Sequence, residues 1–252
     1  METGHEKNVA NFEAVIIIVV SLGAIYNPTQ ALILLPALQA KLAEARAAIQ
    51  LVDAAEAEKA VAVDEREYEF KGLDKYAVNL KRTAEVEIND AAFTRDLQSI
   101  VNKFHAKSKK PALAEAGVGG AAAAGGGANA GENGETGGGR STSQRSFDNQ
   151  IAHLAGILAL LRTKAAVYKP NDAEYTIAAV EAKIAALETV NTAAKNAAIN
   201  LGLAQNARDE ILYHPDAGVL KRIKLIKLQL ARKPGKTSAA YRQVNALEFR
   251  KR

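Results

Sequence analysis

The chain has 252 residues, of which 48% are hydrophobic but only 5% aromatic, with no Cys, no Trp and one Met. The apolar content is therefore mostly Ala, Leu, Val and Ile, which favours helices. The lack of cysteine excludes disulfides, a thiolate nucleophile and cysteine-based metal sites, and four histidines leave little for other metal chemistry. We predict an all-α protein without enzymatic activity and without a cofactor.

The net charge of +5 is distributed unevenly along the sequence. Residues 1–106 carry 11 Lys and Arg against 16 Asp and Glu, a net charge of −5. Residues 107–145 carry a net charge of +2, and residues 146–252 carry 17 basic against nine acidic side chains, a net charge of +8. Such an asymmetry predicts attraction between the two ends of the sequence.

The most apolar run of the chain is Val15–Val20. Extended to residues 14–26 it is about a dozen residues long, whereas a membrane-spanning helix needs about 20. A secretory signal needs a basic start, but the first thirteen residues hold three Glu against one Lys. We predict a first helix that ends before Pro28 in a cytoplasmic protein. Export followed by insertion of this run into a membrane is an alternative.

A long second helix is predicted from about Thr29 to Phe70, where Lys71-Gly72 ends it. Its apolar side chains step by three and four residues, as in a heptad seam: Leu35, Leu38, Leu42, Ala45, Ile49 and Val52. The seam continues through Glu56, Lys59, Val63, Arg66 and Phe70. Such a helix would be roughly 60 Å long, with Pro36 as a candidate kink. A third helix with Leu73, Ala77, Leu80 and Ala84 and a short fourth helix near 91–104 follow.

Residues 107–145 form a Gly/Ala-rich boundary that contains Gly125-Gly126-Gly127 and Gly137-Gly138-Gly139. A segment of this composition buries too little apolar surface to offset its ordering entropy. It also lacks the spacing of a phosphate-binding glycine loop. We predict a flexible tether between an acidic domain, residues 1–106, and a basic domain, residues 146–252.

These two segments read as copies of one unit, because residue n matches residue n + 142 over nearly fifty positions. Tyr26-Asn27-Pro28 falls on Tyr168-Lys169-Pro170 and Arg66 falls on Arg208. After a six-residue shift, Ala91-Ala92-Phe93 falls on Ala239-Ala240-Tyr241. The second copy is predicted to repeat the long helix over 171–212. A third helix with Val219, Ile223, Ile226 and Leu230 and a short helix near 238–249 complete it, with a short strand at 226–230 as the alternative.

The strings YxPN, NARDEILY, found at Asn206–Tyr213, and YRQV, found at Tyr241–Val244, resemble a group of two-copy helical proteins of Bacteroidota. The resemblance covers the second copy well and the first more loosely. It implies two tandem helical units and assigns no active site.

Catalytic and metal-binding patterns are scarce in this sequence. The acidic run 64–69 is typical of a solvated helix face, since neighbouring residues of a helix point in different directions. Glu210 and His214 are four residues apart but lack the further Glu-x-x-His pairs of a di-iron bundle. Arg66 and Arg208 occupy the same seam position in both copies, and we interpret them as register devices paired with Asp or Glu of the facing helix.

A basic arm is the candidate binding site, because the forty residues from Tyr213 hold 11 basic and two acidic side chains. We expect it to contact partners through Lys221, Arg222, Lys224, Lys227, Arg232 and Lys233. A solvated face, an acidic protein surface, and nucleic acid or an anionic membrane are the three interpretations. Few aromatic residues lie nearby for base stacking, which disfavours nucleic acid.

The predicted function is therefore structural or scaffolding. The expected partner is the chain itself, as a homo-oligomer or filament, or another protein. Buried heptad seams and opposite charge on the two copies would drive this assembly. Binding of nucleic acid or an anionic surface by the basic arm is the principal alternative.

Overall fold

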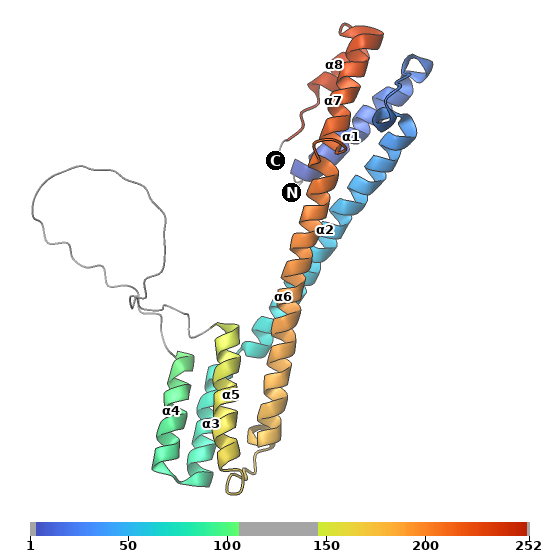
Figure 1. Cartoon of the computed structure of the whole chain (residues 1–252). Coiled ribbons are helices and arrows are strands. Elements are labelled where there is room, and N and C mark those ends of the chain that lie inside the picture. Colours follow the sequence, from blue (N-terminus) through green and yellow to red (C-terminus); the bar gives the residue numbers. More distant parts are fainter. Residues whose placement is uncertain (1–3, 106–145, 251–252) are drawn as a thin grey trace, which may run out of the picture. The chain divides into compact units, whose positions relative to one another are not determined.

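The computed structural model describes residues 4–105 and 146–250, and every regular element in these ranges is a helix or helical turn (Figure 1). The all-α prediction is confirmed for this part of the chain. All of the predicted tether, residues 107–145, lies outside the described residues. The chain divides into a first compact unit, Met1–Glu67 with Thr192–Arg252, and a second compact unit, Tyr68–Asn191.

These compact units do not coincide with the sequence segments 1–106 and 146–252, because each unit takes residues from both. The long helix α2 (Leu35–Phe70) lies mostly in the first unit and ends in the second. The long helix α6 (Ile177–Tyr213) begins in the second unit and ends in the first. The packing of each unit therefore depends on both segments.

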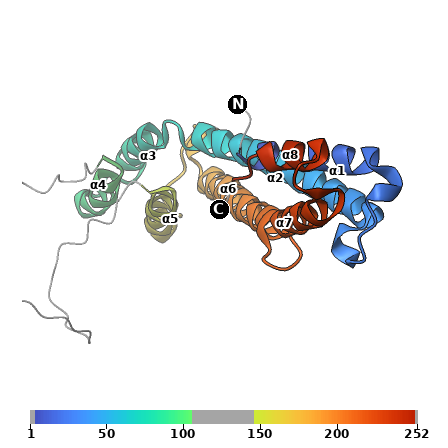
Figure 2. The ribbon, with the colours of Figure 1, turned by 90° about the horizontal axis from the view of Figure 1, so that it is seen from above.

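The first unit contains α1 (Gly4–Ser21), most of α2, the end of α6, α7 (Val219–Leu230) and α8 (Ala239–Ala246). The short turns η1 (Gly23–Ile25) and η2 (Ala31–Ile33) join α1 to α2, and the irregular turn η4 (Ala231–Gly235) joins α7 to α8. Figure 2 shows α1, α2, α7 and α8 gathered together. The core of the first unit contains side chains from these four helices and from α6. It includes Phe12, Leu38, Leu212, Ile226, Leu230 and Val244.

The apolar run Val15–Val20 is one face of this core. Val15, Ile16 and Val19 are buried, whereas Ile17 and Val20 are exposed, as on a helix with one side against the protein. Within the described ranges, no helix has the length and apolarity that crossing a bilayer would require.

The second unit contains the end of α2, α3 (Leu73–Ile88), α4 (Ala91–His105), α5 (Phe147–Thr163), the turn η3 (Ala173–Tyr175) and the start of α6. Helices α3, α4 and α5 lie side by side in both views (Figures 1 and 2). Helices α4 and α5 are antiparallel, since Phe104 contacts His153 while Ile100 lies near Gly156. The core includes Phe70, Leu80, Leu97, Leu154, Ile157, Leu161 and Leu187.

The predicted third helices are α3 and α7, and the predicted apolar stripes are buried in both. The buried residues are Leu73, Ala77, Leu80 and Ala84 in α3, and Val219, Ile223, Ile226 and Leu230 in α7. The alternative strand at 226–230 is wrong, because these residues continue the helix. Both fourth helices begin with a side-chain cap: Asp90 Oδ1 accepts from Phe93 N at 3.2 Å, and Ser238 Oγ accepts from Tyr241 N at the same distance.

The predicted starts of the long helices, at Thr29 and Asn171, are six residues too early. Helix α2 begins at Leu35, so Pro36 lies in the first turn, where its missing N–H has no intrahelical partner to lose, and it does not act as a mid-helix kink. Helix α6 begins after Thr176, whose Oγ1 accepts from Ala179 N at 3.2 Å.

The predicted heptad seam holds for the first half of α2 and then shifts. Ala55 and Ala197 are buried, whereas Glu56 and Ala198, at the extrapolated seam positions, are exposed. An α-helix has 3.6 residues per turn, so a strict seven-residue pattern drifts around its surface over several turns.

Candidate functional site

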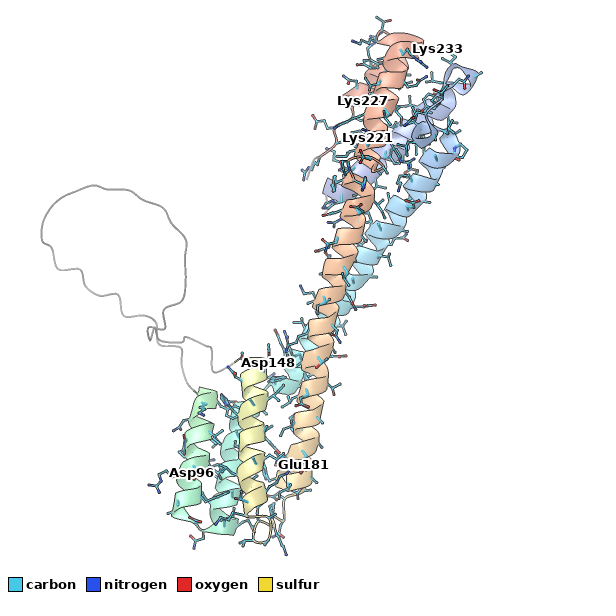
Figure 3. All side chains as sticks on the ribbon, viewed as in Figure 1. Asp96, Asp148, Glu181, Lys221, Lys227 and Lys233 are labelled. Atoms are coloured by element: carbon cyan, nitrogen blue, oxygen red, sulfur yellow. The ribbon has the colours of Figure 1, made fainter. Side chains whose placement is uncertain are left out.

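The predicted basic arm lies on α7 and η4 in the first unit, and Figure 3 labels Lys221, Lys227 and Lys233 on these elements. Lys224, Arg232 and Lys233 are exposed, and Lys221 and Lys227 are partly exposed. Lys227 Nζ lies 3.5 Å from Asn245 O and above the ring of Phe249, and Arg232 Nη2 donates to Gln229 Oε1 at 3.1 Å. These five cations form the accessible part of the arm.

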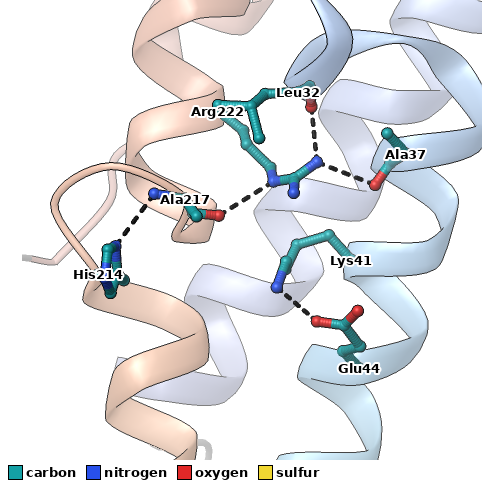
Figure 4. A network of polar contacts seen from close by, with 7 residues as sticks. All are labelled: Leu32, Ala37, Lys41, Glu44, His214, Ala217 and Arg222. Atoms are coloured by element: carbon teal, nitrogen blue, oxygen red, sulfur yellow. Dashed lines mark hydrogen bonds and ion pairs between the residues drawn. The ribbon is translucent and has the colours of Figure 1, made fainter.

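Arg222 does not belong to this accessible surface, because only 7% of it is exposed. Its guanidinium donates to three backbone carbonyls: Nη1 to Leu32 O at 2.6 Å and to Ala37 O at 3.0 Å, and Nε to Ala217 O at 3.1 Å (Figure 4). Burial lowers the pKa of Arg222, while the nearby charge of Glu44 opposes that shift. Arg222 therefore holds α7 to the turn before α2, and its expected role in partner contacts is not supported by this placement.

In the second unit a tyrosine donates the corresponding hydrogen bond to the turn before the long helix. Tyr76, in α3, donates from its hydroxyl to Glu174 O at 2.8 Å. Leu32 and Glu174 are 142 residues apart, and Tyr76 and Arg222 occupy the same position in helices whose buried stripes match at an interval of 146 residues. The same carbonyl of the same turn thus receives a donor from α3 in one unit and from α7 in the other.

The turns that carry these carbonyls are each closed by a second tyrosine. Tyr26 Oη donates to Ile33 O at 2.8 Å, and Tyr168 Oη donates to Tyr175 O at 2.6 Å. Burial raises the pKa of Tyr26 to about 12 and raises that of Tyr168 above its usual range. Sequence reasoning noted both tyrosines as part of a repeated string but did not predict these hydrogen bonds.

The two predicted register residues have different surroundings. Arg208 donates from Nε and Nη2 to Asp209 Oδ1, at 3.0 and 2.7 Å, and both side chains are largely buried. Its acceptor is acidic, as expected, but it is a neighbour on α6 and not a residue of the facing helix. Arg66 is partly buried on α2.

Most ion pairs of the described residues lie outside the basic arm. They join Lys41 to Glu44, Arg46 to Glu13, Lys81 to Glu85, Arg162 to Glu181, Lys164 to Asp90, Lys183 to Glu69 and Arg208 to Asp209. In contrast, Lys221, Lys224, Arg232 and Lys233 form no ion pair with a described carboxylate. The accessible part of the arm thus has positive charge that the described protein does not neutralise.

The exposed carboxylates of α2 show the opposite situation. Asp53, Glu56, Glu58, Asp64, Glu65 and Glu67 are exposed and form no ion pair with a described cation. They belong to the first unit, as the basic arm does, but to a different helix. The predicted solvated acidic face at 64–69 is part of this region, although Glu69 pairs with Lys183 at 3.1 Å.

The histidines whose side chains are described make contacts that support the fold. His5 Nδ1 lies 2.8 Å from Tyr213 Oη, and His153 packs edge-on against Phe104. His214 Nδ1 accepts from Asp216 N at 3.1 Å and from Ala217 N at 3.2 Å. No group of three metal-binding side chains occurs in the part of the chain that the structure describes.

Two surface pockets lie on the described part of the protein. One, of about 150 Å³, is lined by Lys41, Glu210, Ile211, His214 and Ala217. The other, of about 550 Å³, lies on α3 and α4, where Lys81 pairs with Glu85 at 3.0 Å and donates to Gln98 at 2.6 Å. In the first pocket Lys41 pairs with Glu44 and His214 Nε2 lies 3.4 Å from Glu210 Oε1, so these charged groups of both pockets already have protein partners.

Comparisons with protein-family models, with curated proteins and with solved structures found no match to this chain. The resemblance to two-copy helical proteins of Bacteroidota remains a prediction.

Proposed function

We propose that this protein is a non-enzymatic structural protein in which two copies of one helical unit pair with each other inside a single chain. One observation carries the proposal: each hydrophobic core combines side chains of residues 1–106 with side chains of residues 146–252. In the first unit, Leu38 and Phe12 share a core with Leu212 and Ile226. In the second, Phe70 and Leu97 share a core with Leu154 and Leu187.

The interpretation as two copies is supported by contacts that recur at fixed sequence intervals. The turn bonds of Tyr26 and Tyr168 are 142 residues apart, as are the starts of α2 and α6. The carbonyl donors Tyr76 and Arg222 and the caps Asp90 and Ser238 follow at intervals of 146 and 148 residues. Insertions of four and then two residues account for these increments. A duplicated unit explains all of these matches together.

Charge supports the pairing of unlike copies. Two ion pairs join the segments, Lys164 with Asp90 at 3.1 Å and Lys183 with Glu69 at 3.1 Å. In both, the carboxylate comes from the acidic segment and the cation from the basic one. Partly exposed pairs of this kind contribute little free energy, on the order of 0–1 kcal/mol each, but they disfavour pairing of like segments. The apolar cores supply most of the stability.

The test is to insert a specific protease site between residues 125 and 130 and to cleave the folded chain. We expect the two fragments to elute together as one particle with unchanged helical circular dichroism, because both cores span the cut. Cleaved protein in concentrated urea is the control and should separate into two fragments. Fragments that separate under native conditions while each keeps its helicity would contradict the proposal.

A second candidate function is binding of an anionic surface, because the exposed cations of the basic arm have no carboxylate partner among the described residues. The probes are phosphatidylserine vesicles and a DNA duplex. Binding to either should weaken steeply with salt and should be lost in Lys224→Glu/Arg232→Glu. Binding that does not respond to salt would contradict this candidate. Insertion of Val15–Val20 into a membrane is not proposed, because three of these side chains are buried in the first core.

A further inference from the structure

Two exposed stripes of opposite charge lie on different helices of the first unit. The basic stripe consists of Lys221, Lys224, Leu228 and Arg232 on α7 and η4, at steps of three, four and four residues. Residues at these steps share one face of a helix. That face lies opposite the buried stripe of Val219, Ile223, Ile226 and Leu230.

The acidic stripe consists of Asp53, Ala57, Val61, Asp64 and Glu65 on α2. All five are exposed, and they lie on the side of α2 opposite the buried Ala48, Val52 and Ala55. Its carboxylates have no ion pair with a described cation.

The two stripes match in length and in the position of one exposed apolar side chain. Each spans about 17 Å, at 1.5 Å per residue. Each also has one large exposed apolar side chain in its interior, Val61 at 58% and Leu228 at 68% exposure. If the helices run parallel with Val61 on Leu228, Asp53 lies beside Lys221 and Glu65 beside Arg232, while Lys224 lies over Ala57, between the two acidic ends of the stripe.

We propose that a second copy of this chain docks here, with the acidic stripe of one molecule on the basic stripe of the next. The partner is a second copy because this chain itself carries a surface that complements the basic stripe in charge, length and apolar centre. Both stripes are exposed within one molecule, so they do not cover each other there. The contact is heterologous and leaves one free stripe of each sign, so that it can repeat along a row of molecules.

This inference goes beyond the pairing of segments within one chain, and the two tests have separate readouts. Cleavage in the glycine-rich tract reports pairing of the segments, whereas particle mass as a function of salt reports stacking of whole chains. Because two helix faces form a small interface, we expect weak association that needs high protein concentration.

The experiment measures the mass of the full-length protein by light scattering at about 0.01 M and at about 1 M salt, where the Debye lengths are about 30 and 3 Å. We expect the mass to rise with protein concentration at low salt and to fall to that of one chain, 26.7 kDa, at high salt. The basic-stripe variant, Lys224→Glu/Arg232→Glu, and the acidic-stripe variant, Asp53→Lys/Glu65→Lys, should each remain at 26.7 kDa at low salt.

Mixing the two variants provides the decisive arm. In the mixture the native acidic stripe of one variant meets the native basic stripe of the other, and the two reversed stripes are complementary as well, so the mixture should regain the larger particles. This rescue also shows that both variants are folded. Lys75→Glu/Arg82→Glu is the matched control, with the same change in charge on two exposed cations of the second unit, and should assemble like the parent.

A parent protein that stays at the mass of one chain in low salt would overturn the proposal. So would equal loss of assembly in the matched control, or variants that fail to assemble when mixed. Binding of the parent to phosphatidylserine vesicles without any self-association would overturn it in favour of an anionic surface as the occupant.

Discussion

Residue Arg222 illustrates how a charged side chain can serve the fold instead of a partner. Arg222 follows Val219 by three residues and precedes Ile226 by four. It therefore lies on the buried stripe of α7 and not on the basic face. The apolar spacing of the sequence could have predicted that Arg222 is buried, but the prediction of a basic arm counted Arg222 with the neighbouring lysines. A guanidinium is suited to the site because its fixed fork of donors reaches several carbonyls at once.

Replacing Arg222 with leucine should lower the free energy of unfolding by about 2–4 kcal/mol, because buried carbonyls lose their donors. Urea unfolding followed by circular dichroism measures the loss. The matched control is Lys224→Leu on the same helix, where an exposed side chain changes stability by no more than about 0.5 kcal/mol. Similar effects of the two substitutions would contradict the structural role of Arg222.

The buried tyrosines should make the protein sensitive to alkali. Burial raises the pKa of Tyr26 and of Tyr76 to about 12, against about 10 in an unfolded chain. Since the folded state holds these protons more tightly, their contribution to stability is present below pH 10 and is lost as the pH rises toward 12.

We therefore expect the midpoint of urea unfolding to fall between about pH 10 and pH 12. Tyr26→Phe/Tyr76→Phe should be less stable than the parent at pH 8, because two hydrogen bonds are lost, but should lose less of its remaining stability over the alkaline range. An identical alkaline decline in parent and variant would show that other groups cause it.

At the scale of the helices, periodicity predicted more than boundaries. The stripes of α3 and α7 and the ends of α2 and α6 follow directly from apolar spacing and from Gly and Pro. The starts of α2 and α6 could not be predicted in this way. The six residues before each helix fit the helical pattern, but they form a turn that a tyrosine hydroxyl closes. Hydrogen bonds between a side chain and a backbone seven residues away leave no periodic trace in a sequence.

A pair of substitutions in α7 distinguishes the helix from the rejected strand. Ile226 is fully buried and Leu228 is 68% exposed, although a strand would place both on the same face. Ile226→Ala should lower the free energy of unfolding by about 2–5 kcal/mol, whereas Leu228→Ala should change it by less than about 0.5 kcal/mol. Equal losses in urea unfolding would contradict the assignment.

At the scale of the whole molecule, the sequence left open whether residues 1–106 and residues 146–252 pack together within one chain or between chains. Charge and a glycine-rich connection are compatible with both arrangements, and the preference depends on packing between residues far apart in the sequence. The cores show pairing within the chain. The candidate site was only partly predictable: the basic face of α7 followed from charge and spacing, while its acidic counterpart on α2 first read as a solvated surface.

Reversing the order of the two segments should preserve the fold. In the first unit the start of α1 lies against the C-terminal segment, where Asn8 Nδ2 donates to Arg250 O at 2.9 Å and Asn11 Nδ2 donates to Glu248 O at 2.7 Å. In the second unit the end of α4 lies against the start of α5. The two segments therefore meet in a similar way in both units, and residues 106–145 connect them only in the second unit.

A permuted protein with residues 146–252 first, then the glycine-rich tract, then residues 1–106, should keep the parent's helical circular dichroism. Its melting temperature should fall by no more than a few degrees, because no core contact is removed. Loss of helicity would show that the present order of the segments is required for folding.

Because the first core combines residues from near the start and near the end of the chain, it can be completed only after most of the chain has been synthesised. Val15, Ile16 and Val19 are made almost at the start, but α7 and α8, which share their core, lie beyond residue 191. At about 5–20 residues per second, translation of the intervening chain takes roughly ten seconds or more. Throughout that time the most apolar run of the protein lacks the part of its core that α7 and α8 supply, which makes it a site for a chaperone on the nascent chain.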